Sequence, residues 1–388
     1  MPRVAPFRGL RFDPAVAGPL DRLTAPPYDV ISGPTREGLR ARSRYNIVHL
    51  DLASDVPDPS RSGYERAADL LERWRRDGAL AVDPEPSYYA YEIGFTLEGM
   101  SRVVRGILCA LELEAPGGAV LPHEETMDGP VDDRLRLLRA TRTHLSPIYG
   151  TVTGPSDALR DALGRTTANR PDANVVDEEG VEHRVWVMPG GTDVSGWLED
   201  LPMLIADGHH RYATALSYRD ERRREDGPGP WDRVLALVVD AATEPVSVLP
   251  YHRVQLTGPP PAPGRPVPGL AEALAEVDDT RLRYATISRN DGRVAYDIHD
   301  LDGEPPTVRV LHERVLDLIA PEGALAFTHD ATDADRAVRD GAAVAAYLLP
   351  ATTPDRVRAI VARGDRLPRK STFFWPKPRT GMVMLPVG

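Results

Sequence analysis

The sequence predicts a mixed α+β fold that is spread over more than one domain. Segments with apolar residues at helical spacing alternate with short segments that alternate like strands, and neither kind dominates the chain. The 388 residues exceed the size of a typical single domain. Apolar residues make up 41% of the chain and charged residues 27%, so the composition allows ordinary hydrophobic cores.

Two loop-rich segments divide the chain into three predicted domains. APGGAV, residues 115–120, is rich in glycine and proline, and the segment 258–269 carries proline at half of its positions. We therefore expect an N-terminal α+β unit over 1–115, a central domain over 119–257 and a C-terminal mixed α/β unit over 270–388.

The first segment with chemical interest is PPYDVI. Pro26 and Pro27 impose an extended approach, after which Tyr28 and Asp29 offer an aromatic ring and a carboxylate that could line a site. A structural turn in which Asp29 caps the backbone accounts for the same residues. Both interpretations stay open for this segment.

The remaining N-terminal residues predict regular elements. Alternation in YNIVHLDL predicts a strand over 45–52, and apolar spacing predicts a helix over 64–80 that ends at Gly78. SYYAYEIGFTL and RVVRGILCALEL predict two strands joined by a turn at Glu98 and Gly99.

The next block, HEET, opens the central domain at residues 123–126. His123, Glu124 and Glu125 precede the helix breaker Asp128-Gly129-Pro130, and a helix with three leucines follows. A carboxylate or imidazole in such a loop could act as a general base if it is partly buried beside a hydroxyl group. A solvated acidic loop is the structural alternative.

Further along, short helices and strands alternate up to the C-terminus. The predicted helices cover 155–163, 194–201, 312–319 and 354–364. The predicted strands cover 175–189 as a hairpin turning at Glu179-Gly180, 233–241, 246–256, 284–300 as a hairpin about Asn290-Asp291-Gly292, and 342–350.

The motif with the strongest chemistry is DGHHR, residues 207–211. An apolar strand over 203–206 precedes it and a helix follows from Tyr212, so the motif lies in a strand-to-helix turn where helix N–H groups are open. Gly208 permits close approach of an anion, while His209, His210 and Arg211 neutralise its charge. This favours phosphate binding, with Asp207 either holding Mg²⁺ or orienting a histidine.

A zinc site and a purely structural turn are the alternatives to phosphate binding at DGHHR. Zinc binding is disfavoured, because adjacent histidines diverge by about 100° whereas zinc pairs usually lie four residues apart. In the structural arrangement, Asp207 caps the helix and the histidines fill a core.

Lysine is confined to the C-terminal segment. Lys370 and Lys377 lie within eight positions of each other, and the other 45 of the 47 basic residues are arginines. Lysine is a compact point charge that suits a phosphate, so both lysines are candidate phosphate ligands, with mutational chance as the alternative. The aromatic run Phe373 to Trp375 predicts that this segment packs onto the protein or a nucleotide.

Bulk properties exclude several classes. A net charge of -11 argues against a general nucleic-acid binder, and no apolar run approaches the roughly 20 residues of a membrane span. Cys109 is the only cysteine and the start of the chain does not read as a secretory signal, so we expect a cytoplasmic protein. A homodimer is left open.

Four blocks together resemble domain-of-unknown-function family 1015. They are PPYDVI at Pro26, HEET at His123, ADGHHRYATAL at Ala206 and KSTFFWPKPRTG at Lys370. The DGHHR block is similar to the phosphate-binding motif of the ParB/sulfiredoxin superfamily, and especially that of free serine kinases. The resemblance implies a ParB/sulfiredoxin-like central domain, a phosphate and metal loop at 207–211, and Glu124 as the base, with Glu125 as the alternative.

Residues and resemblance together predict a phosphotransferase. It would bind ATP or ADP, or another phosphoryl donor, together with Mg²⁺ and phosphorylate a small hydroxyl compound, with free serine as one candidate acceptor. The predicted catalytic residues are Glu124, Asp207, His209 and His210. The predicted nucleotide ligands are Gly208, His209, His210, Arg211, Lys370 and Lys377, the substrate ligands are Tyr28, Asp29 and His123, and the metal ligand is Asp207. A ParB-like nucleotide-binding switch and, less favoured, a metal-dependent hydrolase are the alternatives.

Overall fold

The computed structural model describes residues 2–53, 61–115, 117–154, 157–198, 201–290, 292–320 and 323–388. The chain divides into two compact units, and each is described by itself. Unit 1 consists of residues 1–122, 126–246 and 376–388, and unit 2 of residues 123–125 and 247–375. Helices and several sheets occur in both, so the predicted α+β class is confirmed.

Unit 1 is built on a nine-stranded mixed sheet. Its strand order is β6-β11-β8-β12-β5-β4-β10-β9, with β1 added beside β5. The strands are β1 (Val4–Ala5), β4 (Ser87–Leu97), β5 (Met100–Glu112), β6 (Val120–Pro122), β8 (Ile148–Val152), β9 (Ala173–Val176), β10 (Glu182–Pro189), β11 (Met203–Asp207) and β12 (Arg233–Asp240). The short strands β2 (Leu10–Phe12) and β3 (Leu80–Val82) pair with each other, as do β7 (Thr143–His144) and β21 (Leu385–Pro386).

Helices cover one face of this sheet. Alternate residues of β5 and β12, such as Ile107, Cys109 and Ala236, share one buried core with side chains of three helices. These helices are α6 (Asp157–Thr167), α7 (Val194–Trp197) and α8 (His209–Asp226). Burial of apolar surface on this face is the main stabilising contribution that the sheet can make.

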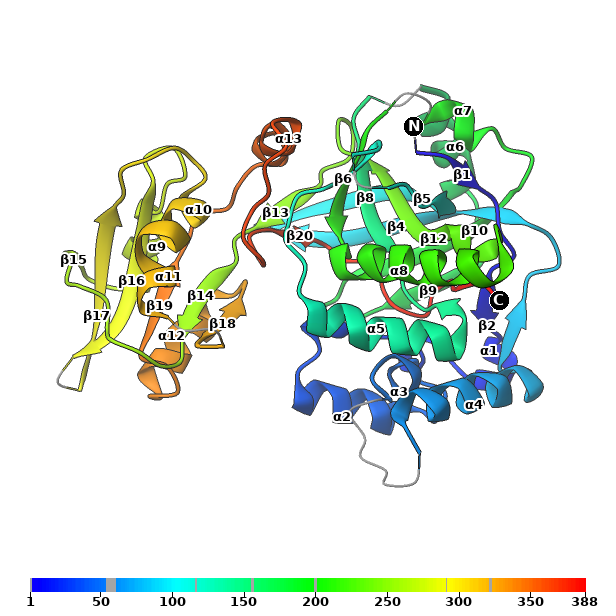
Figure 1. The fold of residues 1–388 in the computed structure, drawn as a ribbon, viewed down its shortest axis with the longest axis horizontal. Coiled ribbons are helices and arrows are strands. Elements are labelled where there is room, and N and C mark those ends of the chain that lie inside the picture. The colour runs from blue at the N-terminus through cyan, green and yellow to red at the C-terminus, as the bar shows by residue number, and fades with distance from the viewer. Residues whose placement is uncertain are drawn as a thin grey trace. The chain divides into compact units, whose positions relative to one another are not determined.

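A second core in unit 1 joins the N-terminal helices to α5 (Asp128–Thr141). Figure 1 shows α8, α5 and α4 (Gly63–Arg76) one beside the next, and α5 contacts both of its neighbours. Helix α4 begins with a capping box formed by Ser62 and Glu65, and the side chain of Trp74 in its last turn is buried. The other short helices here are α1 (Pro14–Ala17), α2 (Gly33–Arg42), α3 (Val48–Asp51) and the 3-10 helices Leu20–Arg22, Tyr28–Val30 and Pro230–Asp232.

One predicted strand is wrong. The segment 45–52 contains the helix α3 instead, which the side chain of Asn46 starts by accepting a hydrogen bond from the N–H of Val48 at 3.0 Å. Nearly the whole segment is buried. The alternation of apolar and polar residues in its sequence therefore does not correspond to a strand with one solvent-exposed face.

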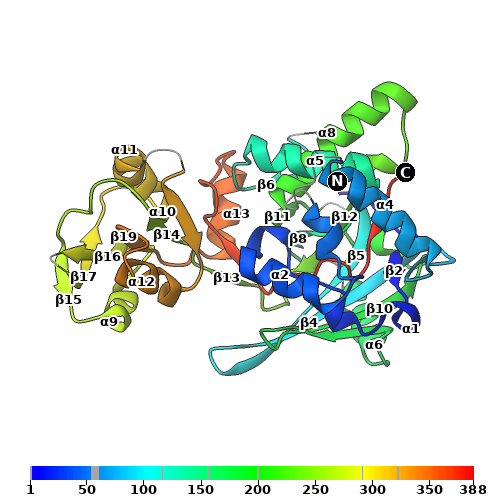
Figure 2. The same ribbon diagram turned by 90° about the horizontal axis from the view of Figure 1, so that it is seen from below.

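Unit 2 contains a six-stranded sheet of order β15-β17-β16-β19-β14-β18. Its strands are β14 (His252–Gln255), β15 (Arg265–Val267), β16 (Arg283–Asn290), β17 (Arg293–Asp300), β18 (Leu325–Thr328) and β19 (Ala345–Leu348). Helices α9 (Leu270–Glu276) and α12 (Ala331–Arg339) both contribute to the core on one face of it, and both are labelled in Figure 2. Strands β13 (Ser247–Leu249) and β20 (Phe373–Trp375) form a separate pair, and α10 (Thr307–Leu311), the π-helix His312–Leu316, α11 (Asp317–Ile319) and α13 (Pro354–Ala362) complete the unit.

This division differs from the three predicted ranges. Residues on both sides of the predicted boundary at 115 pair in one sheet, because β5 lies beside β12. The proline-rich segment 258–269 belongs to unit 2, where β15 pairs with β17. Strand pairing between distant segments is not visible in local composition. The glycine- and proline-rich segments therefore do not mark the boundaries of the two units.

Most predicted elements recur with shifted ends. The hairpins β4-β5, β9-β10 and β16-β17 and the helices α5, α6, α8 and α13 occupy predicted segments. Strand 246–256 is broken at Pro250 into β13 and β14. Asp291, Pro155 and residues 199–200, which belong to predicted turns and helix ends, lie outside the described residues. Among the helices of the described ranges, none has the length and apolar character needed to cross a membrane.

Candidate functional site

The turn at residues 207–211 has the predicted strand-to-helix geometry. Strand β11 runs parallel to β6 and antiparallel to β8, and it ends at Asp207. Gly208 follows with a φ of 95° and occupies the N-cap position of α8, so the N-cap residue itself has no side chain with which to cap the helix. The positive φ favours glycine, and a Cβ added at Gly208 would lie 3.1 Å from the Arg211 guanidinium, which would have to move by a few tenths of an ångström.

Asp207 holds two cations. Lys377 donates from Nζ to one carboxylate oxygen, and Arg211 donates to the other. All three side chains are nearly buried, with exposures of 12% for Asp207, 7% for Lys377 and 10% for Arg211. Two cations therefore face one carboxylate at the N-terminus of α8, which leaves an excess of positive charge where the helix dipole also favours an anion.

Arg211 is further fixed by the segment before β8. Its guanidinium donates to the hydroxyl of Ser146 at 3.1 Å and to the carbonyl of Pro147. This arrangement orients the guanidinium plane, because three acceptors at fixed positions leave one orientation.

The two histidines of the turn differ in their surroundings. His209 is buried, with 8% exposure. His210 is partly buried, and its Nε2 accepts a hydrogen bond from the backbone N–H of Met127 at 3.1 Å. That contact places the ring proton of neutral His210 on Nδ1. The two rings thus differ in burial.

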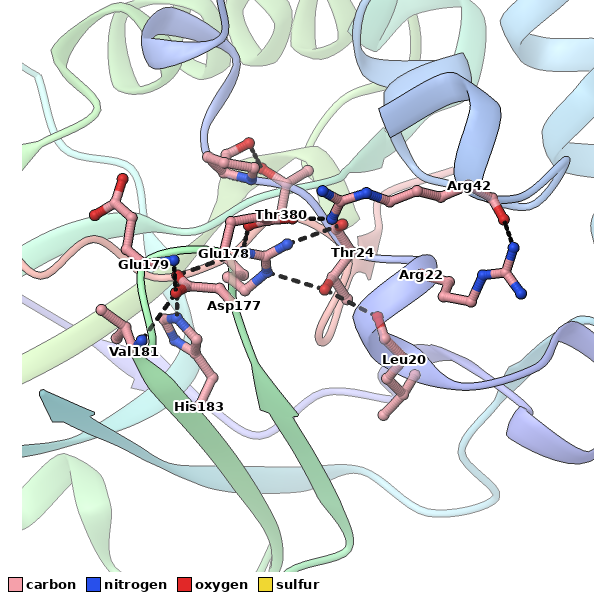
Figure 3. A network of polar contacts seen from close by, with 12 residues as sticks. Leu20, Arg22, Thr24, Arg42, Asp177, Glu178, Glu179, Val181, His183 and Thr380 are labelled. Atoms are coloured by element: carbon pink, nitrogen blue, oxygen red, sulfur yellow. Dashed lines mark hydrogen bonds and ion pairs between the residues drawn. The ribbon is translucent and has the colours of Figure 1, made fainter. Parts of the chain in front are cut away.

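The C-terminal segment that carries Lys377 is anchored through Arg379. Its guanidinium donates to the hydroxyl of Thr24 at 3.0 Å and pairs with Asp177 and Glu178 at 3.4 and 3.2 Å. Its N–H donates to the hydroxyl of Tyr91 at 3.1 Å. Figure 3 shows Thr24, Asp177 and Glu178 gathered in this network.

Backbone pairing adds to this anchor. Ala25 and Thr380 exchange backbone hydrogen bonds at 3.2 and 2.8 Å, so the segment before PPYDVI lies against the C-terminal segment. Two of the four sequence blocks thus meet within unit 1.

Tyr28 lies close to the turn, whereas its neighbour Asp29 is exposed. The Tyr28 ring lies 4.4 Å from the Arg134 guanidinium, and Tyr28 and Arg211 line the same cavity. Burial raises the pKa of Tyr28 to about 12, so its hydroxyl stays protonated at neutral pH.

The first three residues of the HEET block, 123–125, belong to unit 2. His123 is buried, and its Nε2 lies 2.8 Å from the hydroxyl of Thr372. Glu124 accepts from the backbone N–H groups of Lys370 at 2.6 Å and Ser371 at 3.3 Å. Glu125 is exposed. The HEET and KSTFFWPK blocks are therefore adjacent, which local sequence patterns could not show.

Glu124 is the carboxyl group with the chemistry of a base. Burial raises its pKa to about 7, while the hydrogen bond from the Lys370 backbone and the positive charge of Lys370 act in the opposite direction. A carboxylate with a pKa near 7 can take a proton at neutral pH more readily than an ordinary glutamate.

Lys370 has a different environment from Lys377. Its backbone is left-handed, with a φ of 53°, and its Nζ lies 5.4 Å from the centre of the Tyr251 ring. Its carbonyl accepts a hydrogen bond from Arg253 at 2.8 Å. Lys370 thus presents its backbone N–H to Glu124, while its ammonium lies over an aromatic face.

Arg253 holds the backbone of the segment that carries Lys370. It is fully buried, and it donates to the carbonyls of Tyr251, Lys370 and Arg369. Burial lowers its pKa to about 9. The sequence offered no signal for this role, because one arginine among 45 cannot be singled out by type.

The predicted site residues therefore form two groups. Asp207, Gly208, His209, His210, Arg211, Lys377 and Tyr28 belong to unit 1, and His123, Glu124 and Lys370 belong to unit 2. Asp51 and Arg134, which no motif singled out, join the first group, since they line the cavity that also contacts Arg211.

The predicted Mg²⁺ ligand does not fit a metal site of the protein alone. Each carboxylate oxygen of Asp207 already accepts from a cationic side chain. Among the residues that the structure describes, no group of three or more histidine, cysteine, aspartate or glutamate side chains could hold a metal ion. We therefore assign no chemical step to a metal.

Sequence comparison identifies a family. The family described as "Protein of unknown function (DUF1015)" matches residues 4–261, about two thirds of the chain, and the protein belongs to it. The predicted family membership is confirmed. No curated protein matches the sequence.

Several solved structures are similar at low identity. A free serine kinase in complex with AMP is 14% identical with a TM-score of 0.40, and the match covers 69% of this chain and 88% of that one. A conserved hypothetical protein from Pyrococcus furiosus is 16% identical with a TM-score of 0.36, covering 68% and 90%. SbnI with a C-terminal truncation from Staphylococcus aureus is 12% identical with a TM-score of 0.38, covering 71% and 85%.

Proposed function

We propose that this member of the DUF1015 family is a phosphotransferase that binds a nucleotide by its phosphates at the turn 207–211. The observation that carries the proposal is the pairing of Lys377 and Arg211 with Asp207 at the uncapped N-terminus of α8. Backbone N–H groups, the helix dipole and an excess of cationic charge converge there, and a terminal phosphate group matches all three.

Asp207 acts in this proposal as a positioning residue. A carboxylate facing a phosphate directly would repel it, but Asp207 is covered by Lys377 and Arg211. By accepting from both, it holds two flexible cations in one place before the nucleotide arrives. Such preorganisation lowers the ordering cost of binding.

The transfer step is assigned to a small hydroxyl compound, with free serine as the first candidate. The hydroxyl oxygen forms a bond to the terminal phosphorus, and the bond from that phosphorus to the bridging oxygen of the nucleotide breaks. The proton of the hydroxyl group passes to a carboxylate. We assign this base to Glu124 because its pKa of about 7 suits proton transfer at neutral pH.

The experiment is direct. Purified protein is mixed with ATP or ADP in the presence of Mg²⁺, with and without free serine, and phosphoserine is followed by ³¹P NMR. Binding of each nucleotide is measured in parallel by calorimetry. We expect saturable nucleotide binding and a phosphorylated product.

Two results would decide against parts of the proposal. Nucleotide binding without any product from a panel of small hydroxyl compounds would support a nucleotide-dependent switch instead of an enzyme. Absence of binding to ATP, ADP and pyrophosphate would refute the assignment of the turn.

A further inference from the structure

Two peptide groups of unit 2 lie between a guanidinium and a carboxylate. The peptide that joins residues 369 and 370 accepts at its carbonyl from Arg253 at 3.3 Å and donates from its N–H to Glu124 Oε1 at 2.6 Å. The peptide that joins residues 370 and 371 accepts from Arg253 at 2.8 Å and donates to Glu124 Oε2 at 3.3 Å. Arg253 and Glu124 therefore hold opposite ends of the same two peptide groups.

The left-handed backbone of Lys370 makes this arrangement possible. Its φ is 53°, and consecutive N–H groups beside such a residue point toward one side. Two N–H groups aimed at one point form a concave anion site, which the carboxylate of Glu124 occupies. Each carboxylate oxygen can accept two hydrogen bonds, so these contacts orient Glu124 without preventing it from taking a proton.

Further contacts fix the orientation of the Arg253 guanidinium. Arg253 is fully buried, its Nε donates to Nε2 of His312 at 3.1 Å, and its Nη1 also donates to the carbonyl of Tyr251 at 2.8 Å. The ring proton of His312 is therefore on Nδ1, which donates to Asp317 at 3.1 Å. Because all three nitrogens of Arg253 have acceptors, the planar guanidinium has one orientation.

The charge of Arg253 acts on Glu124 through these peptides. A cation at the carbonyl oxygen polarises the whole peptide group, because carbonyl and N–H are conjugated, and this strengthens the N–H donor. Burial raises the pKa of Glu124, whereas the two N–H groups and the charges of Lys370 and Arg253 lower it. Arg253 therefore supports the ionised carboxylate both directly, by its charge, and through the donors that it holds.

Glu124 is the group of this cluster that titrates near neutral pH. Burial lowers the pKa of His252 to about 4, and it also lowers the pKa of His312, so both are neutral above pH 6.5. Arg253 has a pKa of about 9 and keeps its charge below that pH. The other ionisable side chains that face Arg253 or Glu124 are Tyr251, Arg369 and Lys370, and Asp317 faces His312.

We propose that Arg253 is a positioning residue for the base, because it holds the two peptide groups whose N–H donors orient the Glu124 carboxylate. His312 supports this role by fixing the guanidinium. The importance of Arg253 for turnover rests on the proposed phosphotransferase function, whereas its effect on Glu124 can be measured without substrate.

The first measurement is a titration of Glu124 in the full chain. Glutamate is labelled with ¹³C at Cδ, and the signal of Glu124 is assigned by its absence in Glu124→Gln. We expect a pKa of about 8 in Arg253→Gln instead of about 7, because the donors and the charge that favour the carboxylate are lost. Arg314→Gln, which removes an exposed cation from the π-helix that contains His312, should leave the titration unchanged. Equal pKa values of Glu124 in wild type and Arg253→Gln would overturn the proposal.

The pH dependence of kcat/KM separates positioning from damage to the fold. Arg253→Gln should lose about eightfold at about pH 6.5 and less than about twofold at about pH 8.5, where the base is ionised in both proteins. The same loss at both pH values would show a merely structural role and would overturn the proposal. If the wild type has no turnover, the proposed function fails, and the titration of Glu124 alone decides the role of Arg253.

A third measurement applies even if Arg253→Gln fails to fold. Coupling between two sites is reciprocal, so a change at Glu124 must also affect Arg253. Glutamine at position 124 presents an amide donor to one of the two peptide N–H groups, which loosens that peptide. In Glu124→Gln, the Nε–H of Arg253 should exchange with solvent at least about threefold faster by ¹⁵N NMR, whereas the exposed control Glu125→Gln should match the wild type. Equal exchange in wild type and Glu124→Gln would overturn the proposal.

Discussion

Lys377 donates to the carboxylate of Asp207 across a separation of 170 positions in the sequence. The DGHHR turn is therefore incomplete as a local motif, because one of its two cations comes from the end of the chain. Arg379, two residues further on, ties this end to Thr24, Asp177 and Glu178. The position of the Lys377 ammonium thus depends on the contacts of Arg379 with two other segments.

The first prediction concerns this lysine. Lys377→Gln should weaken nucleotide binding about 10-fold to 100-fold, since a hydrogen bond between charged groups contributes about 1.5–3 kcal/mol. Calorimetric titration with ADP and ATP measures the change. Arg136→Gln, which removes an exposed cation paired with Asp132, should leave the affinity unchanged. Equal affinities in wild type and Lys377→Gln would remove Lys377 from the nucleotide site.

The second prediction concerns Gly208. Alanine at this position meets a φ of 95° and a Cβ contact of 3.1 Å with the Arg211 guanidinium, so Gly208→Ala should shift the turn and displace Arg211. A left-handed conformation costs a non-glycine residue about 1–2 kcal/mol. We expect a lower melting temperature and a loss of nucleotide affinity of at least tenfold.

A matched glycine provides the control for this substitution. Gly129 lies in the first turn of α5, and an added Cβ there meets nothing within 4 Å. Gly129→Ala should leave both the melting temperature and the affinity close to those of the wild type. If the two alanine variants behave alike, the turn does not depend on the conformation of Gly208.

The sequence predicted the elements around this turn better than the partners of its side chains. Apolar periodicity and the breaker at Gly208 were sufficient to place β11 and α8, because both signals are local. The scarcity of lysine drew attention to Lys377, although nothing in the sequence linked it to Asp207. That link depends on strand pairing and on the buried network of Arg379, which are long-range properties.

Two further residues of the candidate site were invisible in the sequence. Asp51 lies in a segment predicted as a strand, and Arg134 is one of three arginines on α5. Their importance arises because α3 and α5 bring them together, at 2.8 Å, in the wall of a cavity. Such contacts depend on how the helices pack, and local patterns in a single sequence do not predict them.

The third prediction concerns the proposed base. Glu124→Gln should lower turnover by a factor of about 10² to 10⁴ while nucleotide affinity stays within a few-fold of the wild type. Since the pKa of Glu124 is about 7, the base form is lost as the pH falls through 7, and kcat/KM should decrease about tenfold per pH unit below it. Steady-state rates between about pH 5.5 and 8.5 measure this profile.

Its neighbour supplies the control. Glu125 is exposed, so Glu125→Gln should retain both turnover and the pH profile. A large loss in Glu125→Gln together with normal turnover in Glu124→Gln would move the base by one residue. Normal turnover in both variants would exclude the HEET block from proton transfer.

The last prediction concerns stability at acid pH. Burial lowers the pKa of His144 to about 4 in the folded protein, against 6.5 for an ordinary histidine. Well above pH 6.5, His144 is neutral in both the folded and the unfolded protein. Its protonation therefore does not lower the free energy of unfolding of unit 1 there. As the pH falls from 6.5 to 4, the unfolded chain takes up a proton that the folded chain does not, so the free energy of unfolding decreases. At about pH 5 the loss should be about 2 kcal/mol relative to about pH 7.5.

In His144→Gln that part of the pH dependence should disappear, which urea unfolding at both pH values would measure. His252, which is also buried and has a pKa of about 4, belongs to unit 2, so His252→Gln should change only the unfolding of that unit. An identical pH slope in the wild type and His144→Gln would show that His144 is not the titrating group.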